Sequence, residues 1–268
     1  MGSSAKTVTE WGHCAQSQDG RNSWLVRCRT GFTSGGFAVK HWIRTSLTVA
    51  GLLGAGALAH AQVVTPASKS VVQQRRWQAA LDAFAAEDRA HAPQPGGVLF
   101  VGSSSIRLWD TLEAQFQGVP VIKRGFGGSR LADCAERVPE LVLPYKPRLV
   151  VLYAGDNDLA EGRSPREVVE SLKAFVDAVH TSLPDTRIAY VSIKPSPLRA
   201  ALMPQVRETN DLARAYLATD TDLAYVDVFS AMLDPAGQPR KDLFLPDALH
   251  LNAAGYSVWR EALSAVVR

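Results

Sequence analysis

The sequence predicts a doubly wound α/β fold, in which helices cover both faces of a parallel β-sheet. Three observations support this prediction. Short, continuous runs of Val, Ile and Leu recur along the chain, and such runs are typical of strands buried on both faces. Stretches with helical spacing separate the runs, which indicates parallel βαβ units. Polar clusters follow the first and third runs, at 102–105 and 155–158.

The strand-like runs number five, which fits the shorter of the two common doubly wound orders, 2-1-3-4-5, known as flavodoxin-like. The runs are GVLFVG (97–102), VPVIKRG (119–125), RLVVLYAG (148–155), RIAYVSI (187–193) and LAYVDVF (223–229). In this order strands 1 and 3 are neighbours whose connections leave toward opposite faces. A crevice therefore opens beyond their C-terminal ends, where both polar clusters arrive.

Helices are expected between the strands and before the first one. The predicted helices are 71–90, 104–115, 130–143, 164–183, 204–219 and 252–267. The helix at 164–183 has the clearest ends, because Ser164, Pro165 and Glu167 form a capping-box pattern and Pro184 follows its last turn. Its apolar residues also recur on one face, as expected for a helix packed on a sheet.

Residues 40–61 resemble a secretory signal peptide. Lys40 and Arg44 precede an uncharged run, 45–59, and the small residues of Ala59-His60-Ala61 follow. A membrane span needs about 20 apolar residues, and this run is shorter. We therefore expect cleavage near Ala61, no stable membrane anchor after processing, and a periplasmic or secreted protein.

The leader separates an upstream segment from the part of the chain that follows it. Residues 1–39 show neither strand nor helix periodicity, and we interpret them as a non-native or unstructured upstream extension, with Val39 as an alternative start. Residues 62–95 are a helical lead-in, and 96–268 form the main domain. No internal repeat or linker divides this domain further.

Charge and cysteine content exclude two classes of protein. Residues 1–61 hold six of the 29 Lys and Arg and two of the 26 Asp and Glu, which leaves 23 basic against 24 acidic residues. Without a basic stripe, nucleic-acid binding is not expected. Of three cysteines only Cys134 lies after the leader, so a disulfide-stapled fold is excluded, and Cys134 is interpreted as a packing residue on an apolar helix face.

A serine of Gly102-Ser-Ser-Ser could act as a nucleophile only with a base nearby, and histidine is the candidate base. His91 is expected at the surface, and His180 lies in the last turn of a helix, where a structural role suffices. His250 stands before the final helix, three residues after Asp247. One turn would let the Asp247 carboxylate reach Nδ1 of His250 and leave Nε2 facing outward. The alternative is that both residues only cap the helix near Asn252.

Donors for an oxyanion are also present at the predicted strand ends. The Ser104 amide opens a helix, the Gly128 amide in RGFGGSR lacks side-chain obstruction, and the Asn157 amide follows the third strand. Taken singly, each residue is as easily explained by a turn or a loop cap. Their arrival at the same predicted edge of the sheet favours a functional role.

These motifs resemble the SGNH hydrolases, the GDSL-type esterase and lipase family, over about residues 97–260. The family's blocks I, II, III and V correspond to FVGSSSIRLW, RGFGGS, GDND and DALH, in the family's order. The resemblance implies that Ser104 is the nucleophile, His250 the base and Asp247 its orienter. It also implies that the Ser104 and Gly128 amides and the Asn157 side chain form an oxyanion hole.

Three positions depart from the family pattern. Ser103 replaces the Asp of the name motif, Asp156 stands where block III often has Thr, and Lys123 stands where block II often has Asn. Asp156 could thus alter the preference for substrate charge, and Lys123 the hydrogen bonding of its loop. Ser105 lies one residue beyond the family register and is expected in the first helical turn.

The sequence therefore predicts an exported serine esterase that acts through an acyl-enzyme on Ser104, without a cofactor or metal. Small-molecule or carbohydrate esters with short acyl or acetyl groups are the expected substrates, and no signal for an oligomeric state is present. Two alternatives stay open. The same triad could serve a polysaccharide O-acetyltransferase, or the domain could be a non-catalytic polysaccharide- or nucleotide-binding module, although a Gly-rich phosphate loop is lacking.

Overall fold

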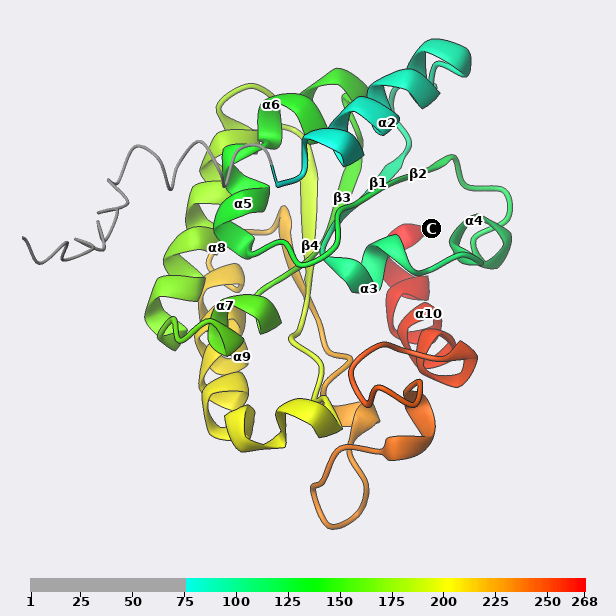
Figure 1. The fold of residues 1–268 in the computed structure, drawn as a ribbon. Helices are drawn as coiled ribbons and strands as arrows, with labels where there is room; N and C mark the ends of the chain where they lie inside the picture. The colour runs from blue at the N-terminus through cyan, green and yellow to red at the C-terminus, as the bar shows by residue number, and fades with distance from the viewer. Residues whose placement is uncertain (1–75) are drawn as a thin grey trace, which may run out of the picture. The chain divides into compact units, whose positions relative to one another are not determined.

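Residues 76–268 are described by the computed structural model (Figure 1), and the predicted leader and upstream extension lie outside this range. In this part of the chain five parallel strands form a sheet with the order β2-β1-β3-β4-β5. The strands are β1 (Val98–Gly102), β2 (Val121–Gly125), β3 (Leu149–Tyr153), β4 (Arg187–Val191) and β5 (Leu223–Val226). The predicted fold class and strand order are confirmed.

The strand register aligns the C-terminal ends of β1, β2 and β3. Gly102, the last residue of β1, pairs with Gly125 at the end of β2 and with Tyr153 at the end of β3. The segments that follow these strands therefore begin at one edge of the sheet, where ligands bind in open α/β sheets.

Helices cover both faces of the sheet (Figure 1). One core packs α2 (Gln78–Ala90), α5 (Leu131–Glu136), α6 (Val138–Leu141), α8 (Pro165–His180) and α9 (Met203–Leu217) on strand residues such as Leu99 and Val101. The other packs α3 (Ser104–Arg107), α4 (Leu112–Gln115) and α10 (Ala253–Val267) on Val98 and Phe100. Alternate residues of a strand thus face opposite cores, which explains why the strands read as continuous apolar runs.

Two predicted helices are interrupted. The helix expected at 104–115 breaks between α3 and α4, where the Trp109 ring stacks on Tyr256 with the ring centroids 5.0 Å apart. The Trp109 carbonyl at this break accepts the Leu112 N–H at 3.2 Å and Nζ of Lys123 at 3.3 Å. The helix expected at 130–143 is divided into α5 and α6, because Pro139 has no N–H to continue the backbone ladder. A short helix that was not expected, α7 (Asp156–Ala160), follows β3.

Helix α8 has the predicted capping box. The Glu167 N–H donates to Ser164 Oγ at 3.4 Å, and the Ser164 N–H donates to Glu167 Oε2 at 2.8 Å. His180 ends this helix with Nε2 2.9 Å from the Thr186 carbonyl, and Cys134 is fully buried on α5. Both residues are therefore accounted for by packing and local hydrogen bonds.

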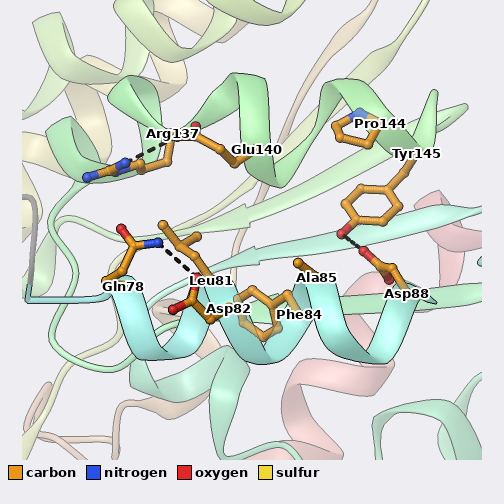
Figure 2. A pocket seen from close by; sticks show the side chains of 10 residues that line it. All are labelled: Gln78, Leu81, Asp82, Phe84, Ala85, Asp88, Arg137, Glu140, Pro144 and Tyr145. Atoms are coloured by element: carbon orange, nitrogen blue, oxygen red, sulfur yellow. Dashed lines mark hydrogen bonds and ion pairs between the residues drawn. The ribbon is translucent and has the colours of Figure 1, made fainter. Parts of the chain in front are cut away.

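Helix α2 lies within the predicted lead-in segment and is fastened to the sheet through Arg124. This buried β2 residue pairs with Glu87 at 3.2 Å and with Asp88, and it donates to Tyr145 Oη at 2.7 Å. A groove of about 290 Å³ lies between α2 and the α6 segment. Figure 2 shows the side chains that line it. No residue with a predicted role lines that groove. Across residues 76–268, no helix has both the length and the apolar character needed to cross a membrane.

Candidate active site

Ser104 is presented by a sharp turn after β1. Gly102 adopts φ 148°, and a Cβ atom there would come within 1.9 Å of the Tyr153 carbonyl oxygen, so only glycine fits. The Ser103 N–H donates to that same carbonyl at 3.0 Å, after which Ser104 opens α3. The strand end therefore delivers the Ser104 hydroxyl to the C-terminal edge of the sheet.

Geometry distinguishes Ser104 from its two neighbours. Ser103 and Ser105 are fully buried, and within the described region their hydroxyls have no hydrogen-bond partner. Ser104 is partly exposed, and its Oγ lies 3.1 Å from Nε2 of His250. Ser105 lies in the first turn of α3, as the sequence predicts, and its carbonyl accepts the Tyr256 hydroxyl at 3.0 Å.

Asp247 and His250 are joined within one loop before α10. Asp247 Oδ2 lies 2.6 Å from His250 Nδ1, and Asp247 Oδ1 accepts the backbone N–H groups of Leu249 and His250 at 3.0 and 2.9 Å. The His250 contact, followed by these N–H groups, lowers the pKa of Asp247 to about 2. An ionised Asp247 holds the proton on Nδ1, so that Nε2 can accept the Ser104 proton.

The helix cap near Asn252 does not require either residue. Asn252 caps α10 itself, because its Oδ1 accepts the Gly255 N–H at 3.1 Å. Asp247 instead contacts His250, and His250 contacts Ser104. The loop is also strained at Ala248, which has φ 57° between Asp247 and Leu249. Strain of this kind is often found at functional sites.

Gly128 lies in a tight turn after β2. The Ser129 N–H donates to the Phe126 carbonyl at 3.3 Å, and Gly128 has φ 73° at the third position of this turn, where glycine is favoured. Within residues 76–268, the N–H groups of Gly128 and Ser104 have no acceptor. Both N–H groups are therefore available to an oxyanion.

Asn157 has its amide oriented from both sides. Its Nδ2 donates to the Ser129 carbonyl at 3.0 Å, and its Oδ1 accepts from Nη2 of Arg199 at 2.8 Å. One Nδ2 hydrogen is used by Ser129, so the second can serve a substrate oxygen. The same carbonyl contact links α7 to the turn that carries Gly128.

Asp158 adds a second link between α7 and this turn. Both its carboxylate oxygens accept the Leu131 N–H, at 3.2 and 3.0 Å, where α5 begins. Burial raises the pKa of Asp158 to about 6, although the bond from Leu131 opposes this change. Asn157 and Asp158 thus hold the segment around Gly128 against the end of β3.

The carboxylate of Asp156 is directed into the protein. Its Oδ2 lies 2.9 Å from Nζ of Lys194 and 3.1 Å from Nη1 of Arg199. Burial alone would raise the pKa of Asp156, but the charges of Lys194 and Arg199 outweigh it and hold this pKa below its usual range. The charge of Asp156 is therefore balanced inside the protein. Lys123, the other charged residue that departs from the family pattern, contacts the α3–α4 connection and not the Gly128 turn.

Sequence reasoning missed Lys194, Arg199 and Asp158. Lys194 had a usable signal, because a lysine directly after a buried strand must lie near the C-terminal edge of the sheet. Arg199 follows a Pro-Ser-Pro loop and belongs to no motif. Among residues 76–268 no group of three or more His, Cys, Asp or Glu side chains is arranged to hold a metal ion.

A doubly wound sheet that brings serine, histidine and aspartate together in a hydrogen-bonded series has the arrangement of a serine hydrolase. Comparison with protein families identifies this class more closely. The model of the GDSL-like lipase/acylhydrolase family matches residues 96–258. The chain belongs to this family, whose enzymes hydrolyse ester bonds.

Solved structures share the fold. A Streptococcus pneumonia protein named for platelet activating factor matches with a TM-score of 0.65 and 20% identity, covering 76% of this chain and all of its own. A GDSL-like lipase from Bacteroides thetaiotaomicron matches with a TM-score of 0.61 and 20% identity, and the match covers 70% of this chain and 96% of the lipase. A family 3 carbohydrate esterase from Talaromyces cellulolyticus matches with a TM-score of 0.52 and 17% identity, and the match covers 64% of this chain and 96% of the esterase. The comparison with curated proteins finds no match.

Proposed function

We propose that this protein is an exported serine esterase that cleaves short-chain acyl esters, acetyl esters in particular, through an acyl-enzyme on Ser104. The observation that carries the proposal is the series Ser104 Oγ, His250 and Asp247, joined at 3.1 and 2.6 Å. These distances suit a nucleophile, its base and the group that orients the base.

In the first step Ser104 Oγ attacks the ester carbonyl carbon and passes its proton to Nε2 of His250. Asp247 stabilises the imidazolium that forms. Negative charge develops on the carbonyl oxygen, where the Ser104 N–H, the Gly128 N–H and Asn157 Nδ2 can donate. One such donor contributes about 10²- to 10³-fold in kcat.

Collapse of the tetrahedral intermediate breaks the bond to the alkoxy oxygen, which takes the proton from His250 and leaves as an alcohol. Water then attacks the acyl carbon as His250 accepts its proton. The bond to Ser104 Oγ breaks in turn and the hydroxyl regains the proton, so the carboxylic acid is released and the enzyme is restored.

The surroundings of the triad support small substrates in an open site. The side chains of His250 and Asp247 are 25% and 47% exposed, so water can reach them. Leu198 and Leu245 are large exposed apolar residues on the loops around the triad, and the Leu198 N–H donates to the Ala248 carbonyl at 3.0 Å. They offer an apolar rim for a short acyl or aryl group, and the fold shared with a carbohydrate esterase makes acetylated sugars a natural second panel.

Ester hydrolysis by the purified protein tests the proposal. We expect turnover of p-nitrophenyl acetate and butyrate, falling with longer acyl chains, and loss of this turnover in Ser104→Ala. Undiminished turnover in that variant would contradict the assignment. Acetyl transfer to a sugar that exceeds hydrolysis would favour the O-acetyltransferase, and binding without turnover would favour the binding module.

Export is proposed from the leader at 40–61. The protein exported to the periplasm or medium should begin just after Ala61, as N-terminal sequencing or intact mass would show. A mature chain that keeps residues 1–39 would contradict both the cleavage and the interpretation of that segment.

A further inference from the structure

A buried cluster of charged side chains lies directly behind Asn157. Nζ of Lys194 donates to Asp156 Oδ2 at 2.9 Å and to the Tyr153 hydroxyl at 3.0 Å. The side chains of Lys194 and Asp156 are only 1% and 7% exposed, and that of Arg199 is 18% exposed. Such a cluster is costly to bury, so its retention beside the site calls for an explanation.

Arg199 connects this cluster to Asn157. Its Nη1 lies 3.1 Å from Asp156 Oδ2, while its Nη2 donates to Asn157 Oδ1 at 2.8 Å. The planar guanidinium thus reaches both groups at once, through an ion pair with Asp156 and a hydrogen bond to Asn157. Arg199 belongs to the 3₁₀ helix η2 (Pro197–Leu202), whose Leu198 also contacts the triad loop through the Ala248 carbonyl.

The two partners of Asn157 define which way its amide points. If the amide were flipped, Nδ2 would face the Arg199 guanidinium and Oδ1 would face the Ser129 carbonyl, and both contacts would be repulsive. A charged donor on Oδ1 also polarises the amide, which strengthens the hydrogen bonds that Nδ2 donates. Arg199 therefore acts on both the direction and the strength of this donor.

We propose that Arg199 is a positioning residue that fixes and polarises the Asn157 amide as an oxyanion donor, while the Asp156–Lys194 pair holds the guanidinium in place. The inference rests on the oxyanion role given to Asn157 under the proposed function. It also accounts for Asp156, because a threonine at that position could not provide a carboxylate to Arg199.

A double-mutant cycle tests whether Arg199 acts through Asn157. The variants are Arg199→Met, Asn157→Ala and their combination, assayed for kcat and KM on p-nitrophenyl acetate. We expect Arg199→Met to lower kcat by about 10- to 100-fold with KM changed less than about twofold, and Asn157→Ala to lower kcat by about 10²- to 10³-fold. The combined variant should match Asn157→Ala, since the route through the amide is already lost.

Arg214→Met is the matched control. Arg214 is exposed on α9 and pairs with Asp227 at 3.0 Å, so its loss should leave kcat unchanged. Arg199→Lys keeps a cationic donor without the planar fork, and its kcat should fall between those of Arg199→Met and the wild type. If Arg199→Met does not fold, as judged by circular dichroism, Arg199→Lys replaces it in the cycle.

Two results would overturn the inference while leaving the oxyanion role of Asn157 in place. The first is a kcat loss from the Arg199 substitution that is equally large in the Asn157→Ala background, since Arg199 would then act independently of the amide. The second is wild-type kcat in the folded Arg199 variant. Wild-type kcat in Asn157→Ala is a different outcome, because it removes the proposed oxyanion role and the inference with it, while Ser104→Ala still tests the esterase itself.

Discussion

His250 Nε2 lies 3.1 Å from Ser104 Oγ, although 146 positions of the chain separate the two residues. The contact depends on how α10 packs against the start of α3. The Tyr256 hydroxyl donates to the Ser105 carbonyl at 3.0 Å, and the Tyr256 ring stacks on Trp109 at 5.0 Å. These contacts hold the loop before α10 beside the turn after β1.

Substitution of each serine in turn separates the nucleophile from its neighbours. Ser104→Ala should lower kcat for a short-chain ester by at least about 10⁴-fold, because the attacking atom is lost. Ser103→Ala and Ser105→Ala should keep kcat within a few-fold of the wild type, since each removes a buried hydroxyl without a partner. Steady-state kinetics on the three purified variants checks this, and a large loss in Ser103→Ala with full activity in Ser104→Ala would reverse the assignment.

Asp247→Asn should impair the enzyme more than Asp247→Ala. Asp247 Oδ1 accepts two backbone N–H groups, so the single oxygen of an asparagine must stay there and its NH₂ must face His250 Nδ1. That arrangement favours the tautomer with a proton on Nε2, which cannot accept from Ser104, and a loss of about 10⁴-fold in kcat follows.

In Asp247→Ala water can take the place of the carboxylate, because the Asp247 side chain is 47% exposed, and we expect a smaller loss of kcat. The two kcat values, measured side by side on one ester, check this order. An Asp247→Asn variant more active than Asp247→Ala would show that the tautomer argument is wrong.

Asp158 should make folding stability depend on pH in the acid range. Its pKa is raised by burial from 3.8 to about 6, so the folded state holds the proton more tightly than the unfolded state. The stabilisation is present below about pH 4 and is lost as pH rises toward 6, by up to about 3 kcal/mol. Relative to the wild type, Asp158→Asn should therefore gain stability between pH 4 and 7.

Urea unfolding at pH 4 and pH 7 measures this difference in the free energy of unfolding. Asp211→Asn on the exposed face of α9 is the control, and its difference from the wild type should vary little with pH. A difference for Asp158→Asn that is equal at the two pH values would rule out titration of Asp158 in this range.

The cap of α8 should contribute measurably to stability. Ser164→Ala removes the acceptor of the Glu167 N–H and should lower the free energy of unfolding by about 1 kcal/mol, which lowers Tm by about 2–4 °C. Ser171→Ala is the comparison, because the half-buried Ser171 in the same helix caps no backbone N–H and only donates to the Glu167 carbonyl at 3.0 Å, so its loss should change Tm less. Equal Tm values for Ser164→Ala and the wild type would show that the cap is replaced by water.

The fold was predictable because its strands are buried on both faces. Continuous apolar runs such as LVVLY at 149–153 carry that signal in any context, and Ser164 with Glu167 marks a helix start locally. Helix continuity was less predictable. At the break, Trp109 contacts Tyr256 and Lys123, which both lie outside the predicted helix, so the helix segment alone does not reveal it. Pro139, in contrast, could have indicated the break at α6.

The candidate site likewise contains residues that the sequence predicts and residues that it does not. Five of its residues could be predicted because they follow strand ends or lie in short motifs: Ser104, Gly128, Asn157, Asp247 and His250. The structure places His250 in contact with both Ser104 and Asp247. Their catalytic roles stay a prediction. Arg199 could not be found from sequence, because its contact with Asn157 depends on how the η2 loop folds over the sheet edge.

Covalent trapping of the nucleophile tests the central claim most directly. Diethyl p-nitrophenyl phosphate transfers a diethylphosphoryl group to an activated serine and releases p-nitrophenol. Intact mass spectrometry should show one such group on the wild-type protein, peptide mapping should place it on Ser104, and Ser104→Ala should stay unlabelled. Labelling of another residue, or undiminished labelling of Ser104→Ala, would contradict the account.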